Sequence, residues 1–178
     1  NNNDLSTTQF ALAGLSAASA VVPVNRAVLT NAGTSPDHHA VGNGCFTYQA
    51  SGHAGCSSSM TASAIWVQRL GDRPANHAQV QAAMRWIRDN WRHDGHIAAP
   101  LAGWGVNSYY YYLWAVSKGL EVSDSDDENI INAHDVGGER SPVDDGFPQE
   151  NPSFYYDIAY TLLQTQRANG QWAAENNN

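Results

Sequence analysis

The sequence predicts an all-α protein in which about six helices are joined by long loops. Apolar residues recur at helical spacing in several stretches, as Val80, Ala83, Met84, Ile87 and Trp91 do. Between these stretches the chain is rich in Gly, Ser, Asn, His and acidic residues and has no period. A chain of 178 residues, 42% of them hydrophobic, is long enough for one domain with a substantial core. We place this domain at residues 4–175 and regard the Asn triplets at 1–3 and 176–178 as ends outside the fold.

Start and stop signals delimit the predicted helices. Ser and Asp residues that can cap a helix precede most of them, and Pro23, Gly71, Gly119 and the pair Asn169-Gly170 end four of them. In chain order, the predicted helices cover residues 4–20, 24–29, 58–70, 74–91, 109–118 and 153–169. The first consists largely of small residues, which let a neighbouring helix approach closely. We therefore expect it to be buried on more than one face.

The fifth predicted helix contains an aromatic run, four consecutive tyrosines at 109–112 followed by Leu113 and Trp114. These side chains cover all sides of a helix. Such a helix is either deeply buried with its hydroxyl groups hydrogen-bonded, or it lines a pocket. The candidate ligand-binding residues are therefore Tyr109, Tyr110, Tyr112 and Trp114.

Cys45 and Cys56 are the only cysteines, and both lie in the long loop at 31–58. A disulfide between them would contribute about 2–3 kcal/mol in the loop-entropy model, and the segment 46–49 between them can form a short strand. The alternative is a pair of buried free thiols, which cytosolic proteins often contain. We favour the disulfide, because the Gly, Ser and His residues around both cysteines predict an exposed loop. A disulfide in turn predicts an exported protein, either secreted or periplasmic.

The longest loop, 121–151, is strongly acidic, because nine carboxylates follow Glu121 and only Arg140 opposes them. Within it, Asp124, Asp126 and Glu128 alternate as carboxylates do in loops that bind Ca²⁺. The Gly and the distal Glu of an EF-hand are missing, so the match is partial, and a solvated acidic loop is the alternative. Ca²⁺ is the only cofactor that this pattern indicates.

Three segments resemble the repeat of prenyltransferases and squalene cyclases. Segment 166–172, Gln-Arg-Ala-Asn-Gly-Gln-Trp, fits the Q-x3-G-x-W spacing of the QW motif in that repeat, whose Gln caps a helix end and stacks on the Trp. Segment 8–15, Thr-Gln-Phe-Ala-Leu-Ala-Gly-Leu, is similar to the start of a helical hairpin in bacterial relatives. Segment 59–62, Ser-Met-Thr-Ala, is similar to the start of an inner helix. The resemblance implies an α/α toroid, of which six helices would form a half-barrel.

Segment 124–127, Asp-Ser-Asp-Asp, resembles the D-x-D-D motif of class II terpene cyclases in the same family. There the middle residue, here Asp126, protonates an alkene or epoxide inside a dry aromatic cavity. This chain departs from that pattern, because Glu128-Asn129 replaces the family's Thr and small apolar helix start, the loop is acidic, and only half of one barrel is present.

We therefore predict a non-enzymatic structural or interaction domain of an exported bacterial protein. It would bind a protein partner, or another copy of itself, through its aromatic face and acidic loops. The alternative is a class II terpene-cyclase-like enzyme that uses Asp126 as general acid on a polyprenyl substrate.

Other classes of function find no support in the sequence. The net charge is −8 and the chain has one lysine, so we expect no nucleic acid to bind. No apolar run reaches the roughly 18 residues of a membrane span. The seven histidines show no Cys/His cluster with zinc spacing, although His93 and His96 could chelate a metal with a third ligand. No G-x-S-x-G, P-loop or Rossmann fingerprint is present.

Overall fold

The computed structural model describes residues 4–50, 55–98 and 108–172. Most of the secondary structure in this part of the chain is helical, so the prediction of a mainly helical protein is confirmed. The elements are α1 (Leu5–Ala18), α2 (Arg26–Gly33), η1 (Ser35–His38), β1 (Phe46–Thr47), β2 (Cys56–Ser57), α3 (Ser58–Leu70), α4 (Ala78–Asp89), α5 (Tyr109–Glu121), η2 (Ala133–Asp135) and α6 (Phe154–Thr165). The two strands form a small antiparallel sheet in which Phe46 pairs with Ser57 and Thr47 with Cys56. None of the helices described is long and apolar enough to cross a membrane.

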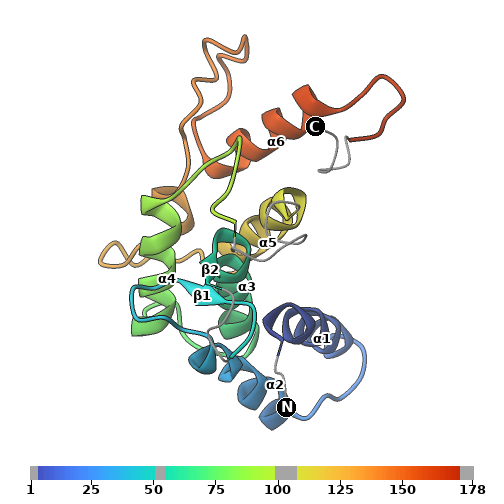
Figure 1. Cartoon of the computed structure of the whole chain (residues 1–178), viewed down its shortest axis with the longest axis vertical. Coiled ribbons are helices and arrows are strands. Elements are labelled where there is room, and N and C mark those ends of the chain that lie inside the picture. The colour runs from blue at the N-terminus through green and yellow to red at the C-terminus, as the bar shows by residue number, and fades with distance from the viewer. Residues whose placement is uncertain (1–3, 51–54, 99–107, 173–178) are drawn as a thin grey trace.

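Helix α3 lies at the centre, with α1, α2, α4 and α5 around it (Figure 1). All its residues from Ser58 to Gln68 are buried. The Ser57 hydroxyl caps its first turn by accepting a hydrogen bond from the Met60 amide, 3.3 Å away. Small residues on α3 allow close packing, and Gly119 of α5 lies against the Ala62 carbonyl. The predicted end of the fifth helix at Gly119 is therefore wrong: this glycine is inside α5, where it allows the close approach to α3.

Helix α1 contacts the core along a single buried row, Leu5, Gln9 and Leu12. The expectation of burial on several faces is wrong, because Gly14 is exposed and none of the residues that the structure describes comes within 4 Å of the position that a Cβ would take. Gln9 joins α1 to the core through a polar contact. The Tyr111 hydroxyl donates to Gln9 Oε1 at 3.0 Å and lies 3.0 Å from the Ser63 hydroxyl. Burial raises the pKa of Tyr111 to about 12, because the phenolate would lose its solvation there.

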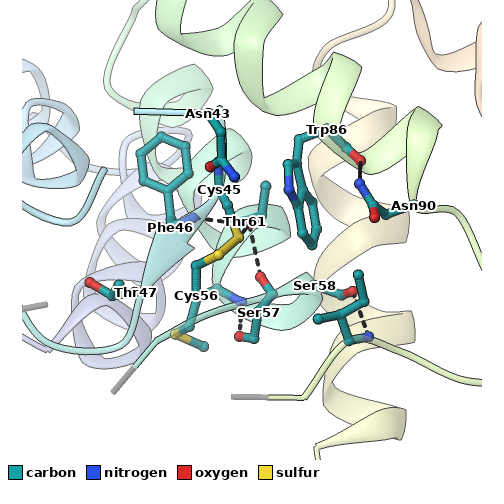
Figure 2. The surroundings of a disulfide bond; sticks show 12 residues. Asn43, Cys45, Phe46, Thr47, Cys56, Ser57, Ser58, Thr61, Trp86 and Asn90 are labelled. Carbon is teal, nitrogen blue, oxygen red and sulfur yellow. Dashed lines mark hydrogen bonds between the residues drawn. A yellow bond between two sulfur atoms is a disulfide. The ribbon is translucent and has the colours of Figure 1, made fainter. Parts of the chain in front are cut away.

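The predicted disulfide between Cys45 and Cys56 is present, with the Cα atoms 5.7 Å apart. The strand predicted within 46–49 is confirmed as β1. The expected exposure is wrong for Cys45 and Phe46, which have no exposed surface, whereas Cys56 is half-buried. Figure 2 shows the bond beside the start of α3, where the Phe46 amide donates to Thr61 Oγ1 at 3.1 Å. The disulfide thus closes the hairpin directly before α3, and the hydrogen bond from Phe46 to Thr61 joins the hairpin to that helix.

Helix α6 lies beyond α5 when viewed from α3 (Figure 1). It begins after Ser153, whose hydroxyl accepts a hydrogen bond from the Tyr156 amide at 3.1 Å. It ends at Thr165, because Gln166 takes an extended conformation. The prediction that this helix continues to Asn169 is therefore wrong. The residues at 1–3 and 176–178, predicted to lie outside the fold, are not among those that the structure describes.

Candidate functional site

An apolar groove of about 790 Å³ lies between α5, α6 and the segment that follows α6. This volume falls within the range of roughly 300–1,000 Å³ that is usual for ligand sites. Its lining comes from three parts of the chain: Tyr110, Leu113, Trp114 and Ser117 of α5, Ile158 and Leu162 of α6, and Gly170, Gln171 and Trp172 of the last segment. None of these side chains carries a charge, so the groove is suited to an apolar occupant.

Helical spacing on α5 and α6 explains two walls of the groove. The lining residues of α5 recur at steps of three or four positions, which places them on one face of the helix: Tyr110, then Leu113 and Trp114, then Ser117. Ile158 and Leu162 are four residues apart on α6 and face them.

Trp172 forms the third wall by folding back on the end of α6. Its indole Nε1 donates to the Leu162 carbonyl at 2.8 Å. In a continued helix this carbonyl would accept from the Gln166 amide, so the indole takes the place of the next helical hydrogen bond. The Gln166 side chain donates to the Gly170 carbonyl at 2.9 Å and closes the intervening turn, in which Gly170 has a φ of +80°.

The four predicted ligand-binding residues divide between groove and core. Tyr110 and Trp114 line the groove. Tyr112 is 1% exposed and belongs to the core, where burial raises the pKa of its hydroxyl. The Tyr109 hydroxyl donates to the His93 carbonyl and ties α5 to the segment after α4. The aromatic run therefore serves both of the roles that the sequence left open.

Trp114 extends the aromatic surface from the groove onto α1. It is 38% exposed, and its ring stacks on that of Phe10 at a centroid distance of 5.3 Å. The edge of Trp66 meets the same indole at 4.9 Å. Phe10 itself is 55% exposed. The aromatic surface of Trp114 therefore reaches from the groove, which Trp172 also lines, to Phe10 on α1.

The opposite side of α6 is fixed by Asp157, which has no exposed surface. Its carboxylate accepts hydrogen bonds from the Trp91 indole at 2.9 Å and from the amides of Gly138, Glu139 and Arg140 at 2.8, 3.1 and 3.0 Å. Four donors compensate for the burial of the charge. Gly137, with a φ of +83°, brings the loop so close to α6 that a Cβ would lie 2.4 Å from the Phe154 Cα.

One group of side chains has the residue types of a catalytic triad but not its geometry: Thr161, His93 and Glu139. The Thr161 hydroxyl lies 3.3 Å from His93 Nδ1, and His93 Nε2 lies 3.8 Å from Glu139 Oε2. A nucleophile and its base approach to about 2.6–3.2 Å, and Thr161 is 9% exposed. We interpret these contacts as a link between α6 and the loops around it.

The predicted calcium ligands and the predicted acid lie on the surface. Asp124, Asp126 and Glu128 are all exposed. Among the described residues, no three His, Cys, Asp or Glu side chains are grouped so that they could hold a metal ion. Asp126 lacks the dry surroundings that a cyclase acid requires. Calcium binding and acid catalysis stay predictions, and the groove lining does not include Asp124, Asp126 or Glu128.

Part of the site was not predicted from the sequence. Ile158 and Leu162 of the last helix, which form one wall of the groove, were not among the predicted ligand-binding residues. Asp157 was not singled out, although an acidic residue between Tyr156 and Ile158 in an apolar helix indicates a buried carboxylate with partners. The first helix was expected to be buried on more than one face, and nothing in the sequence shows that the side of α1 with Phe10 is uncovered.

No family model, curated protein or solved structure matches the chain. The resemblance to the prenyltransferase and squalene-cyclase repeat therefore stays a prediction, and the site is interpreted from its own geometry.

Proposed function

We propose that this chain is a non-enzymatic interaction domain whose α5–α6 groove binds an amphipathic, basic helix of a partner protein. The observation that carries the proposal is the groove itself, whose described lining is apolar and aromatic and contains no charged side chain. A groove between two helices is a common receptor for the apolar face of a third. Helix α6, with 12 residues, provides roughly 18 Å of wall along such a ligand.

Several polar groups of the lining already have partners within the chain. The Trp172 indole donates to Leu162, and the Ser117 hydroxyl donates to the Trp114 carbonyl at 2.9 Å. The Gln171 amide donates to Asn169 Oδ1 at 3.1 Å. Such groups neither attack nor protonate an occupant, and they gain nothing from polar contacts with it. This favours binding by apolar contact over catalysis.

Charge favours a basic partner over a second copy of the chain. The net charge is −8, and the acidic loop 121–151 begins at Glu121, one helical turn after Ser117 of the groove. Two copies would repel each other, whereas Lys or Arg residues beside the apolar face of a ligand helix would be attracted.

We further infer that the helices form part of an α/α toroid-like arrangement and that the protein is exported. The turn between Gln166 and Trp172 supports the first inference. These are the Gln and the Trp of the segment that resembles the QW motif, and both form hydrogen bonds at the end of α6. The disulfide supports the second, because such bonds persist mainly in oxidising compartments.

Binding of designed helical peptides tests the function. The probe is a labelled Leu/Lys amphipathic peptide of about 14 residues, the length that spans the groove. The control peptide has the same apolar pattern but carries Glu in place of Lys. Fluorescence anisotropy should show binding of the Leu/Lys peptide to the whole chain. The substitution Ser117→Tyr, which fills the groove, should abolish it.

The matched control adds the same side chain elsewhere. Thr30→Tyr places a tyrosine on the exposed side of α2 and should leave binding unchanged. Equal binding to the native chain and to Ser117→Tyr would contradict the proposal. Gel filtration measures whether the chain self-assembles. If the native chain is a dimer and Ser117→Tyr converts it to a monomer, the occupant of the groove is a second copy of the chain.

A further inference from the structure

We propose that Asn169, in the turn that carries Trp172, is a site of spontaneous conversion to aspartate and isoaspartate. The inference is independent of the proposed function. Asn169 precedes Gly170, which has no side chain to hinder its amide nitrogen. Every residue from 163 to 172 is exposed, and no atom of the described residues lies within 4 Å of the position that a Cβ on Gly170 would take. The surroundings therefore allow this part of the backbone to move.

The reaction needs water and no other reagent. The Gly170 amide nitrogen attacks Asn169 Cγ and forms a new C–N bond. The Cγ–Nδ2 bond breaks, and ammonia leaves with the proton from the Gly170 nitrogen. Water then opens the resulting cyclic imide. Hydrolysis at one carbonyl gives aspartate, and hydrolysis at the other gives isoaspartate, in which the main chain passes through the former side chain.

Hydrogen bonds in the turn favour the attack. The Gln171 amide donates to Asn169 Oδ1 at 3.1 Å, and this bond folds the carboxamide back along the main chain towards the peptide units that follow it. The same donor stabilises the negative charge that develops on Oδ1 when the nitrogen adds to Cγ. The Gly170 amide donates to the Arg167 carbonyl at 2.8 Å, and this bond must open first.

A second Asn-Gly pair in the same chain provides the comparison. Asn43 also accepts a hydrogen bond from the second amide after it, that of Cys45, at 3.0 Å. Gly44 has a φ of +88°, similar to that of Gly170. However, Gly44 is buried against α4, where a Cβ would lie 2.2 Å from the Ala82 carbonyl oxygen, and the next residue is bonded in the disulfide. Packing therefore prevents at Asn43 the rotation that the turn at Asn169 permits.

Conversion would alter one end of the groove. Isoaspartate inserts an additional methylene into the main chain, and either product adds a negative charge. The bond from Gln166 to the Gly170 carbonyl and that from Trp172 to the Leu162 carbonyl both depend on the present course of this turn. Ageing of the protein would therefore release Trp172 from the end of α6.

Peptide mapping by mass spectrometry tests the inference on the whole chain after incubation at mildly alkaline pH. Trypsin cleaves after Arg167, so Asn169 and Asn43 fall in different peptides. We expect Asn169 to convert while Asn43 persists, and both to convert at similar rates in denaturant. Asn169→Gln should abolish the conversion at this position. Equal rates at both sites in the native chain, or conversion at neither site in the native chain while the denatured chain reacts, would overturn the proposal.

Discussion

At the scale of single residues, Asp157 and Tyr111 show how buried polar groups join helices that lie apart in the sequence. Asp157 connects α6 with three successive amides of the acidic loop and with Trp91. Tyr111 connects α5 with Gln9 of α1 and Ser63 of α3. Both side chains therefore influence the position of α5 or α6, the two helices that form the groove.

Replacing Asp157 with alanine should destabilise the protein by about 3 kcal/mol, because four donors lose a charged acceptor in a buried place. Urea unfolding measures the change. Asp124→Ala removes an exposed carboxylate from the same acidic loop and should change the free energy of unfolding by less than about 0.5 kcal/mol. Similar values for the two variants would show that the four hydrogen bonds do not hold α6.

Tyr111 makes the stability depend on pH in the alkaline range. Its pKa is raised from 10.0 to about 12 by burial, so the unfolded chain loses the phenolic proton before the folded chain does. The stabilisation is fully present below pH 10 and is lost progressively as the pH rises towards 12, by up to about 2–3 kcal/mol. Tyr111→Phe should flatten this part of the stability curve. An unchanged slope would assign the decline to other groups.

At the scale of elements, two glycines set the crossing of α2 with the end of α3. A Cβ on Gly71 would lie 2.3 Å from the Gly33 Cα, and one on Gly33 would lie 2.6 Å from the Gly71 Cα. The φ of Gly71 is −86°, which alanine readily adopts, so the limit here is space rather than backbone conformation.

Gly71→Ala should therefore destabilise the protein by about 2 kcal/mol or more, as overpacking does in other cores. Gly14→Ala makes the same change in the exposed middle of α1, where it should stabilise by about 0.5–1 kcal/mol through helix propensity. Thermal unfolding of the two variants should give shifts of opposite sign. A neutral Gly71→Ala would mean that α2 can move away at little cost.

The disulfide acts on one hairpin rather than on the helices. Reduction should lower the stability by about 3 kcal/mol and leave the far-ultraviolet circular dichroism of the folded protein nearly unchanged. The Phe46 amide, which is bonded to Thr61, should exchange its hydrogen faster after reduction. Loss of helical signal on reduction would show instead that α3 depends on the hairpin.

Apolar periodicity, together with helix caps and stops, predicted all six helices, because these are local signals within a segment. The helix ends were predicted less well, because tertiary contacts determine them. Gly119 reads as a stop but is a point of contact with α3. The sequence signal for the end of α6 is the pair Asn169-Gly170. The helix ends earlier, because the Trp172 indole donates to the Leu162 carbonyl in place of the next helical amide. The cysteine pair was predicted correctly and its burial was not, since burial depends on α3 and α4.

At the scale of the whole molecule, the acidic charge and the apolar groove act together on a ligand. The sequence predicted Tyr110 and Trp114 as ligand-binding residues, but the groove also requires two residues of α6 and the returning Trp172. That combination arises only when segments about 50 residues apart in the chain come together, a long-range contact that no local pattern encodes.

Binding of the Leu/Lys peptide should weaken as salt is added, because the net charge of −8 acts over a distance that shrinks from about 10 Å to about 3 Å between 0.1 and 1 M salt. The apolar contribution should persist, so affinity should level off rather than vanish. Titrations at increasing salt concentration measure this. An affinity that does not respond to salt would assign the binding to apolar contact alone.

Helix α3 is surrounded by α1, α2, α4 and α5, whereas α6 rests on α5, on the loop at 137–140 and on Trp91. The chain therefore contains an inner region that is held on all sides and an outer region that is held by fewer contacts. Partial opening should begin at the outer region and detach α6, Trp172 and that loop together, while the helices around α3 stay folded. The groove exists only while this outer region is closed. An occupant of the groove would therefore slow the hydrogen exchange of the α6 amides. The exchange rate of this one peripheral helix would then measure binding.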